Sequence, residues 1–156
     1  MSDVWMGLLV VGGVTLMIVT QLKGLTMTWK RTVLLPAIVS VIGFVGLAGT
    51  TGVGWEDVFC MVVSAVMAAA IGVGQGVSMH LEARQGTLWG QMPLRGVWLW
   101  VALFASRVVM VAVAYAIGAK AAYSFDAIIL TLGVNRLAQA AVVGTRALKA
   151  GVNFAS

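Results

Sequence analysis

Hydrophobic residues along this chain fall into five long runs, separated by short polar segments. The runs cover residues 3–22, 33–50, 58–76, 97–118 and about 126–146. An apolar helix needs roughly 20 residues to cross the hydrocarbon core of a bilayer, and each run is close to that length. The pattern therefore predicts five transmembrane helices that form a single domain over residues 1–156.

Composition places the chain in the membrane class. Hydrophobic residues make up 61% of the sequence and charged residues only 10%, too few to cover a soluble surface of this size. The first run is preceded by no positive charge and does not end in a small-residue cleavage site, so we interpret it as a mature helix and not as a secretory signal. The expected fold class is an all-α integral membrane bundle, located in the bacterial cytoplasmic (inner) membrane.

Glycine spacing within the runs predicts where the helices pack against one another. Lipid gives no hydrophobic drive for helix association, so close backbone approach at small residues must supply the packing energy. The glycines that fit such seams are Gly12, Gly13, Gly43, Gly46, Gly49, Gly72 and Gly76. We expect helix–helix contacts at these positions.

The longest polar segment, residues 77–96, alternates apolar and polar residues through SMHLEA and then reaches a turn-like RQG. This predicts a short hairpin between the third and fourth helices, because Gly86 and Pro93 would interrupt an amphipathic helix. His80 and Glu82 would then point to the same side of a strand. Two ligands do not make a metal site, so no metal is expected, and we interpret the segment as a solvated loop at headgroup level.

Positive charge outside the runs is distributed unevenly. With five crossings, one side of the membrane receives seven Lys and Arg residues, whereas the other receives only Lys120. The seven are Lys23, Lys30, Arg31, Arg84, Arg95, Arg146 and Lys149. Short cytoplasmic loops retain Lys and Arg, so we expect the N-terminus outside, and the C-terminus and the hairpin inside. The net charge of +5 then reflects topology and contact with anionic lipids, and not binding to nucleic acid.

Two arginines lie within the apolar runs. Arg107 is near the centre of the fourth run, and Arg136 lies at comparable depth in the fifth. At about 100° per residue, Arg136 and Gln139 share one helix face, and Asn135 lies on its flank. Because no acidic residue lies deep in any run, amides, backbone carbonyls, water or a bound anion must satisfy the guanidinium groups. We expect Arg107, Asn135, Arg136 and Gln139 to face the bundle interior and share one ligand-binding polar cavity.

Three interpretations of this cavity stay open. The arginines hold helices together through backbone carbonyls, with no ligand. Alternatively, they bind an anionic or carbonyl-bearing amphiphile such as a lipid, a quinone or an isoprenoid phosphate. In the third interpretation they line a conduction path, which five crossings would form only in an oligomer.

Two classes of function follow. In the first, the protein is a non-enzymatic membrane module that binds a lipophilic ligand or a membrane partner, as an accessory, protective or export factor. In the second, it is a compact intramembrane enzyme in which Asp126, Glu56 or Asp57 is the acid or base, while Arg107 and Arg136 hold an anionic group.

The sequence favours the non-enzymatic module because no run carries an acid or a histidine at depth, where general acid–base chemistry would need one. Nucleophile elbows, zinc motifs, phosphate-binding loops and haem-attachment motifs are all absent from the sequence. No cofactor is expected. The expected partners are membrane lipids, a lipophilic small molecule, and a membrane protein or further copies of this chain, but no nucleic acid.

Residues 72–109 contain a glycine-rich helix end, a short loop with a central glycine, and a tryptophan-bearing helix with an arginine at mid-membrane depth. These features are Gly72, Gly76, Gly86, Trp100 and Arg107. In this arrangement the chain resembles the CcdC-like family of small bacterial membrane proteins, and a weaker similarity over residues 130–147 rests on Gly133, Gln139 and Arg146. The biochemical activity of that family is not established, so the resemblance implies a multi-spanning topology and no mechanism.

Overall fold

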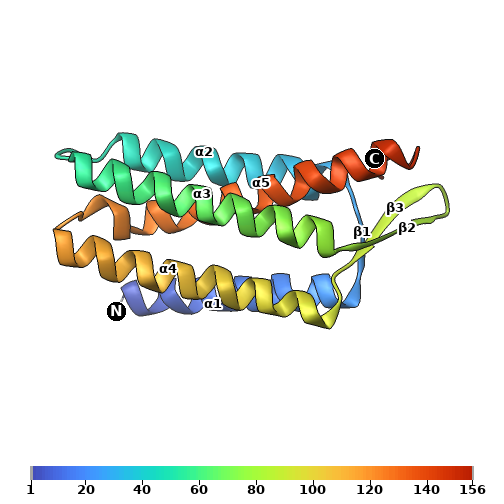
Figure 1. The fold of residues 1–156 in the computed structure, drawn as a ribbon, viewed down its shortest axis with the longest axis horizontal. Coiled ribbons are helices and arrows are strands. Elements are labelled where there is room, and N and C mark those ends of the chain that lie inside the picture. Colours follow the sequence, from blue (N-terminus) through green and yellow to red (C-terminus); the bar gives the residue numbers. More distant parts are fainter. Residues whose placement is uncertain (1, 156) are drawn as a thin grey trace.

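The computed structural model describes residues 2–155, which form five long helices and a small β-sheet (Figure 1). The helices are α1 (Ser2–Lys23), α2 (Leu35–Ala48), α3 (Trp55–Ser78), α4 (Val97–Ile117) and α5 (Phe125–Lys149). A π-helical turn, η1 (Lys30–Leu34), leads without a break into α2. All five helical segments are long and apolar enough to cross a membrane. The prediction of five apolar helices, each long enough to span a membrane, is therefore confirmed, and each end lies within three residues of its predicted position.

The hairpin between α3 and α4 is also confirmed. Strand β2 (His80–Arg84) pairs antiparallel with β3 (Thr87–Gln91) through a two-residue turn. The turn residues Gln85 and Gly86 both have positive φ angles, 52° and 77°, as a type I′ turn requires. A third strand, β1 (Leu25–Thr26), pairs with the other side of β3 and was not predicted.

The sheet lies at one end of the bundle, here named the sheet end (Figure 1). The C-terminal segment joins it there, because the Leu88 amide donates to the Asn153 carbonyl at 3.1 Å and the Ala155 amide donates to the Met27 carbonyl at 2.9 Å. The opposite end, here named the far end, holds the α2–α3 loop and the short helix η3 (Ala121–Tyr123) between α4 and α5. The connections of both ends are thus built from residues that lie far apart in the sequence.

Helix α5 packs closely against both α2 and α3. A Cβ atom added to Gly43 of α2 would lie only 2.6 Å from the Leu130 amide nitrogen, and one added to Gly76 of α3 only 2.8 Å from Cβ of Val142. Backbones this close leave no room for a side chain, which is the packing that small residues provide in membranes. The small-residue prediction is confirmed for Gly43, Gly46, Gly72 and Gly76.

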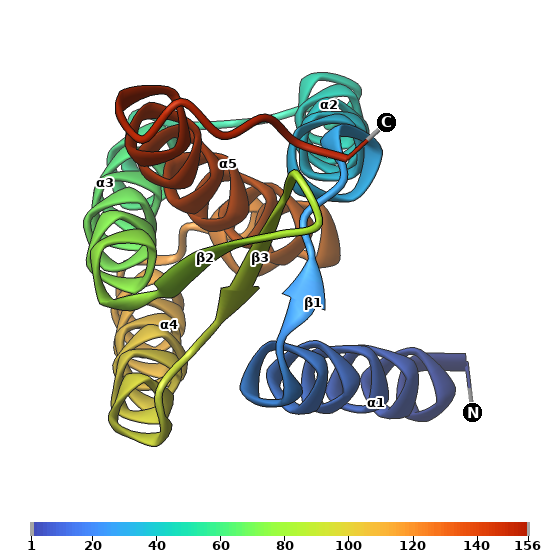
Figure 2. The same ribbon diagram turned by 90° about the vertical axis from the view of Figure 1, so that its right-hand side faces the viewer.

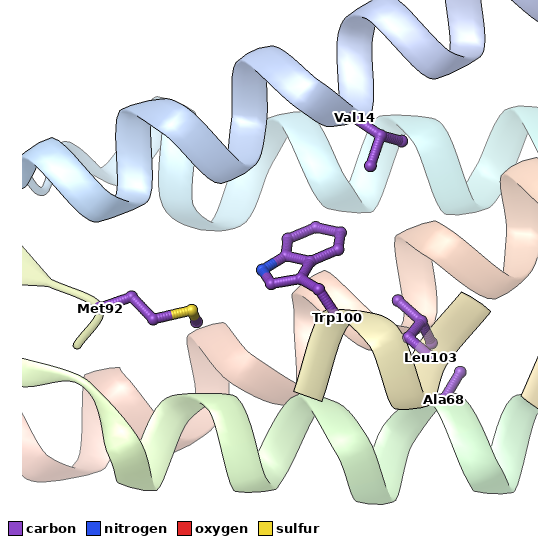
Figure 3. Packing of buried hydrophobic residues seen from close by; sticks show 5 residues of the cluster. All are labelled: Val14, Ala68, Met92, Trp100 and Leu103. Carbon is purple, nitrogen blue, oxygen red and sulfur yellow. The ribbon is translucent and has the colours of Figure 1, made fainter. Parts of the chain in front are cut away.

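Helix α1 packs much more loosely and is tilted away from the common direction of the other helices (Figure 2). Added Cβ atoms at Gly12 and Gly13 would meet nothing within 4 Å, and one at Gly49, directly after α2, would meet only carbonyl oxygens of α2, so the seam prediction is wrong for these three glycines. Contacts between α1 and the bundle include Val14, which packs near the fully buried indole of Trp100 from α4 (Figure 3), and the buried side chain of Gln21.

Candidate functional site

Arg136 of α5 is held by two glutamine amides from different helices. Its Nη1 donates to Oε1 of Gln139, one turn further along α5. Because a guanidinium has only donors, the amide of Gln21 in the last turns of α1 is oriented with its oxygen toward Arg136, where it accepts a 2.8 Å hydrogen bond from Nη2. Both partners of the Arg136 charge are therefore neutral.

The two amides are themselves fixed by burial. Gln21 is 7% exposed and Gln139 is 4% exposed. The nitrogen of the Gln139 amide lies 3.1 Å from the Met79 sulfur, a weak acceptor at the end of α3. With its nitrogen directed to Met79, Gln139 keeps its oxygen toward the guanidinium.

A cavity of about 90 Å³ adjoins this group, at the sheet end of the bundle. That volume is room for about three water molecules. Its polar lining residues, which we call the Arg136 cavity set, are Thr20, Gln21, Thr26, Arg31, Thr32, Arg136 and Gln139. The remaining wall is apolar and includes Leu25, Met27, Met79 and Val143. The cavity thus combines a hydrogen-bonding side with an apolar side.

The Arg136 cavity carries positive charge without a compensating acid. Arg31 and Arg136 both line it, whereas no carboxylate, histidine or cysteine does. Within residues 2–155, the ion pairs are those of Glu82 with His80 and Arg84, in the hairpin. Neither cavity arginine is therefore neutralised by an acidic side chain of the described chain. Chemically, the site can bind an anion or a carbonyl oxygen through its guanidinium, amide and hydroxyl groups.

Arg107 lies elsewhere. Its Nη2 donates at 3.0 Å to the Ala122 carbonyl of η3, at the far end. It lines a separate cavity of about 40 Å³, together with residues that include Phe104 and Thr131. The prediction that Arg107 and Arg136 share one cavity is therefore wrong. The backbone positions of the two residues lie at comparable depth in α4 and α5, but their long side chains extend toward opposite ends of the bundle.

Asn135 is also outside the Arg136 cavity. Its side chain is fully buried, and Nδ2 donates at 2.9 Å to the Ala68 carbonyl of α3. The same stretch of α5 is where Gly72 of α3 approaches the Asn135 backbone. Asn135 thus joins α3 to α5. Of the four predicted site residues, the structure brings only Arg136 and Gln139 together.

The cavity residues that sequence reasoning missed come from α1, β1 and η1. Gln21 carried one available signal, because it is a polar residue inside the last turns of an apolar run. Arg31 belongs to the Lys and Arg residues whose distribution predicts the topology, and its sequence context carries no further signal. Nothing in a single sequence indicates that either residue meets α5.

The three carboxylates of the enzymatic interpretation lie at the far end, away from Arg136. Asp57 is buried, and its oxygens accept from the amides of Ala121 at 2.7 Å, Ala122 at 3.1 Å and Gly54 at 3.0 Å. Glu56 is exposed. The Asp126 carboxyl occupies the space that the missing side chain of Gly46 leaves.

Comparison with known protein families, with curated proteins and with solved structures finds no match for this chain. Across residues 2–155, no three His, Cys, Asp or Glu side chains gather as the ligands of a metal ion would. Function is therefore inferred from the Arg136 cavity itself.

Proposed function

We propose that this protein is a non-enzymatic membrane module that binds an anionic or carbonyl-bearing amphiphile, and that the polar end of the ligand occupies the Arg136 cavity. The observation that carries the proposal is the guanidinium of Arg136, which borders a cavity and is held only by the neutral amides of Gln21 and Gln139. Such a module would act as an accessory, protective or export factor, with lipids, a membrane protein or further copies of the chain as partners.

The energetics support a ligand at this position. A charged side chain within the hydrocarbon region costs a few kcal/mol on insertion scales, so it is normally paired or hydrated. Two amide oxygens satisfy part of the guanidinium, which has five N–H donors. An anion or a carbonyl oxygen in the adjoining cavity would accept hydrogen bonds from more of these donors, and an anion would also compensate the charge of Arg136.

The apolar side of the cavity supports an amphiphile over a fully polar solute. Leu25 and Met27 come from the α1–α2 connection, while Met79 and Val143 come from α3 and α5. A ligand with a polar head and an apolar tail would match both kinds of wall. The enzymatic alternative has less support, because Asp57 is engaged by three backbone amides and no carboxylate lines the cavity.

We also propose that the sheet end faces the cytoplasm of a bacterial inner membrane, with the N-terminus outside. The basis is the excess of Lys and Arg in the connections at this end. The resemblance to the CcdC-like family stays a prediction and concerns topology alone. A reporter that is active only in the cytoplasm, fused to the C-terminus, should be active, and a matched periplasm-dependent reporter should be inactive. The reverse result would contradict this orientation.

The binding proposal is tested by native mass spectrometry of the full chain released from its host membrane. Wild-type protein should retain a copurified amphiphile, and Arg136→Gln should lose it, because Gln removes the charge while keeping a polar side chain. Arg107→Gln is the matched control, since it removes the same charge from the other cavity and should retain the amphiphile. Equal retention by all three proteins would contradict the proposal.

A further inference from the structure

We infer that the ligand group taken up by the Arg136 cavity is a terminal phosphate, that is, a phosphate monoester carried by a lipid or free inorganic phosphate. The inference rests on the proposed function and goes beyond it, because it names the chemical class of the bound group. It is carried by the convergence of a second arginine, Arg31, on the same cavity as Arg136.

The charge of the cavity favours phosphate over other anions. Two guanidinium groups line it, and no carboxylate does. A phosphate monoester carries about −1.5 to −2 charge at neutral pH and three strong acceptor oxygens. A carboxylate or a phosphodiester carries about one negative charge, so it would leave one of the two arginines uncompensated. A terminal phosphate is thus the common biological group that matches both the charge and the number of donors.

Arg31 is positioned by the π-helical turn η1. In this turn the Leu35 amide donates to the Lys30 carbonyl five residues earlier. Pro36 follows and has no amide hydrogen, so an ordinary α-helical bond at that position is unavailable. The Arg31 amide is held at 3.4 Å by Oγ1 of Thr28. Widened turns of this kind often occur at functional sites, and here the turn carries an arginine to the cavity.

The two arginines occupy different depths of the site. Arg31 is exposed and belongs to the mouth of the cavity, whereas Arg136 is half-buried on α5. Within residues 2–155 the Arg31 guanidinium makes no ion pair and no hydrogen bond, so its donors are available. A phosphate between the two would receive donors from both sides.

Threonine hydroxyls add neutral donors to the same cavity. The hydroxyl of Thr26 has no hydrogen-bond partner among the described residues, and that of Thr32 contacts only the weak acceptor sulfur of Met27 at 3.6 Å. Either hydroxyl is free to turn toward a phosphate oxygen. The cavity volume of about 90 Å³ is sufficient for one tetrahedral oxyanion.

The inference is tested with the purified full chain in detergent, by titration with three defined amphiphiles. The probes are dioleoyl phosphatidic acid, which has a terminal phosphate, dioleoyl phosphatidylcholine, which has a phosphodiester, and oleate, which has a carboxylate. Phosphatidic acid should bind about tenfold more tightly than the other two, as expected for one additional charge-assisted contact. Equal affinity for the three probes would overturn the inference.

Arg31→Gln provides the decisive variant because Arg31 is exposed and its replacement leaves the helix packing intact. This variant should lose the preference for phosphatidic acid, while the control Lys30→Gln, a neighbouring position of the same turn outside the cavity, should keep it. An unchanged preference in Arg31→Gln would overturn the phosphate inference. If Arg136→Gln still loses its copurified amphiphile in that case, the proposed binding function stands by itself.

Competition with inorganic phosphate distinguishes a phosphate carried by a lipid from free inorganic phosphate as the ligand. If inorganic phosphate displaces phosphatidic acid from the wild-type protein, the phosphate group alone is sufficient for binding. If it does not, while phosphatidic acid binds with the expected preference, the ligand is a phosphate carried on a lipid. Both results support a terminal phosphate, and failure of phosphatidic acid and inorganic phosphate alike to bind would overturn it.

Discussion

Arg107 and Asp57 do not contact each other, yet they bind opposite sides of the same residue, Ala122. The Arg107 guanidinium donates to the Ala122 carbonyl at 3.0 Å, and the Ala122 amide donates to Asp57 Oδ1 at 3.1 Å. The positive and negative charges are thus linked through the backbone of η3. This arrangement gives the guanidinium of Arg107 one backbone acceptor, while its Nε is buried without a partner among the described residues, and it joins α3, α4 and η3 at the far end.

Asp57 should therefore be important for stability and not for binding. Asp57→Asn keeps the shape but removes the charge from a buried group that accepts three backbone hydrogen bonds. Hydrogen bonds to charged groups contribute about 1.5–3 kcal/mol each, so we expect the free energy of unfolding to fall by about 2 kcal/mol, measured by denaturation in detergent. The exposed neighbour Glu56 supplies the control, and Glu56→Gln should leave stability unchanged. A fully stable Asp57→Asn protein would contradict this role.

Arg107→Leu should change little. The variant loses the bond to the Ala122 carbonyl, worth about 1.5–3 kcal/mol, but it also removes the insertion cost of a guanidinium, about 2.5–3.5 kcal/mol. We expect the free energy of unfolding to stay within about 1 kcal/mol of the wild-type value, and the copurified amphiphile to be retained. Loss of the amphiphile in this variant, at wild-type abundance, would show that Arg107 belongs to the binding site after all.

The helices were predictable because each apolar run specifies its own crossing, independent of what lies beside it. The β2–β3 hairpin was predictable for a similar reason, since its alternation and its Gln85-Gly86 turn are local. Strand β1 has only two residues and pairs with a segment more than sixty positions away, so it leaves no periodic signal.

The cavity was beyond sequence reasoning for a different reason. Helical periodicity placed Arg136 and Gln139 on one face, and the structure agrees. It could not indicate that Gln21 lies beside them, because the two glutamines are 118 residues apart in the chain. Comparable depth of Arg107 and Arg136 was also misleading, since a long side chain can place its charge a full turn or more from its own Cα atom.

Arg146 should stabilise the end of α3. Its Nη1 donates to the carbonyls of Gly76 at 2.7 Å, Val77 at 3.2 Å and Met79 at 2.9 Å, groups that have few or no partners within the helix. Arg146→Ala should lower the free energy of unfolding by about 2 kcal/mol and speed amide hydrogen exchange around Met79. Lys149→Ala, at an exposed position of the same helix end, is the control. Equal exchange rates in both variants would contradict a capping role.

The hairpin should respond to acid through Glu82. Hydrogen bonds from Arg84, and secondarily from His80, hold the pKa of the Glu82 carboxyl below its usual value. A lowered pKa in the folded state means that these contacts stabilise the hairpin at neutral pH and are lost as the pH falls through that pKa. Carboxyl ¹³C NMR should show Glu82 titrating below an ordinary glutamate, and Arg84→Gln should raise its pKa. Arg95→Gln should have no effect on Glu82, and a similar rise there would contradict the pairing.

The most direct test of the central claim is to observe the Arg136 guanidinium itself. Side-chain ¹⁵N–¹H signals of the arginines can be recorded before and after exhaustive removal of copurified amphiphiles by detergent exchange. We predict that the Arg136 signal shifts on removal and returns when the extracted amphiphiles are added back, while the Arg107 signal stays in place. An Arg136 signal that does not change, or a shift confined to Arg107, would contradict binding in the Arg136 cavity.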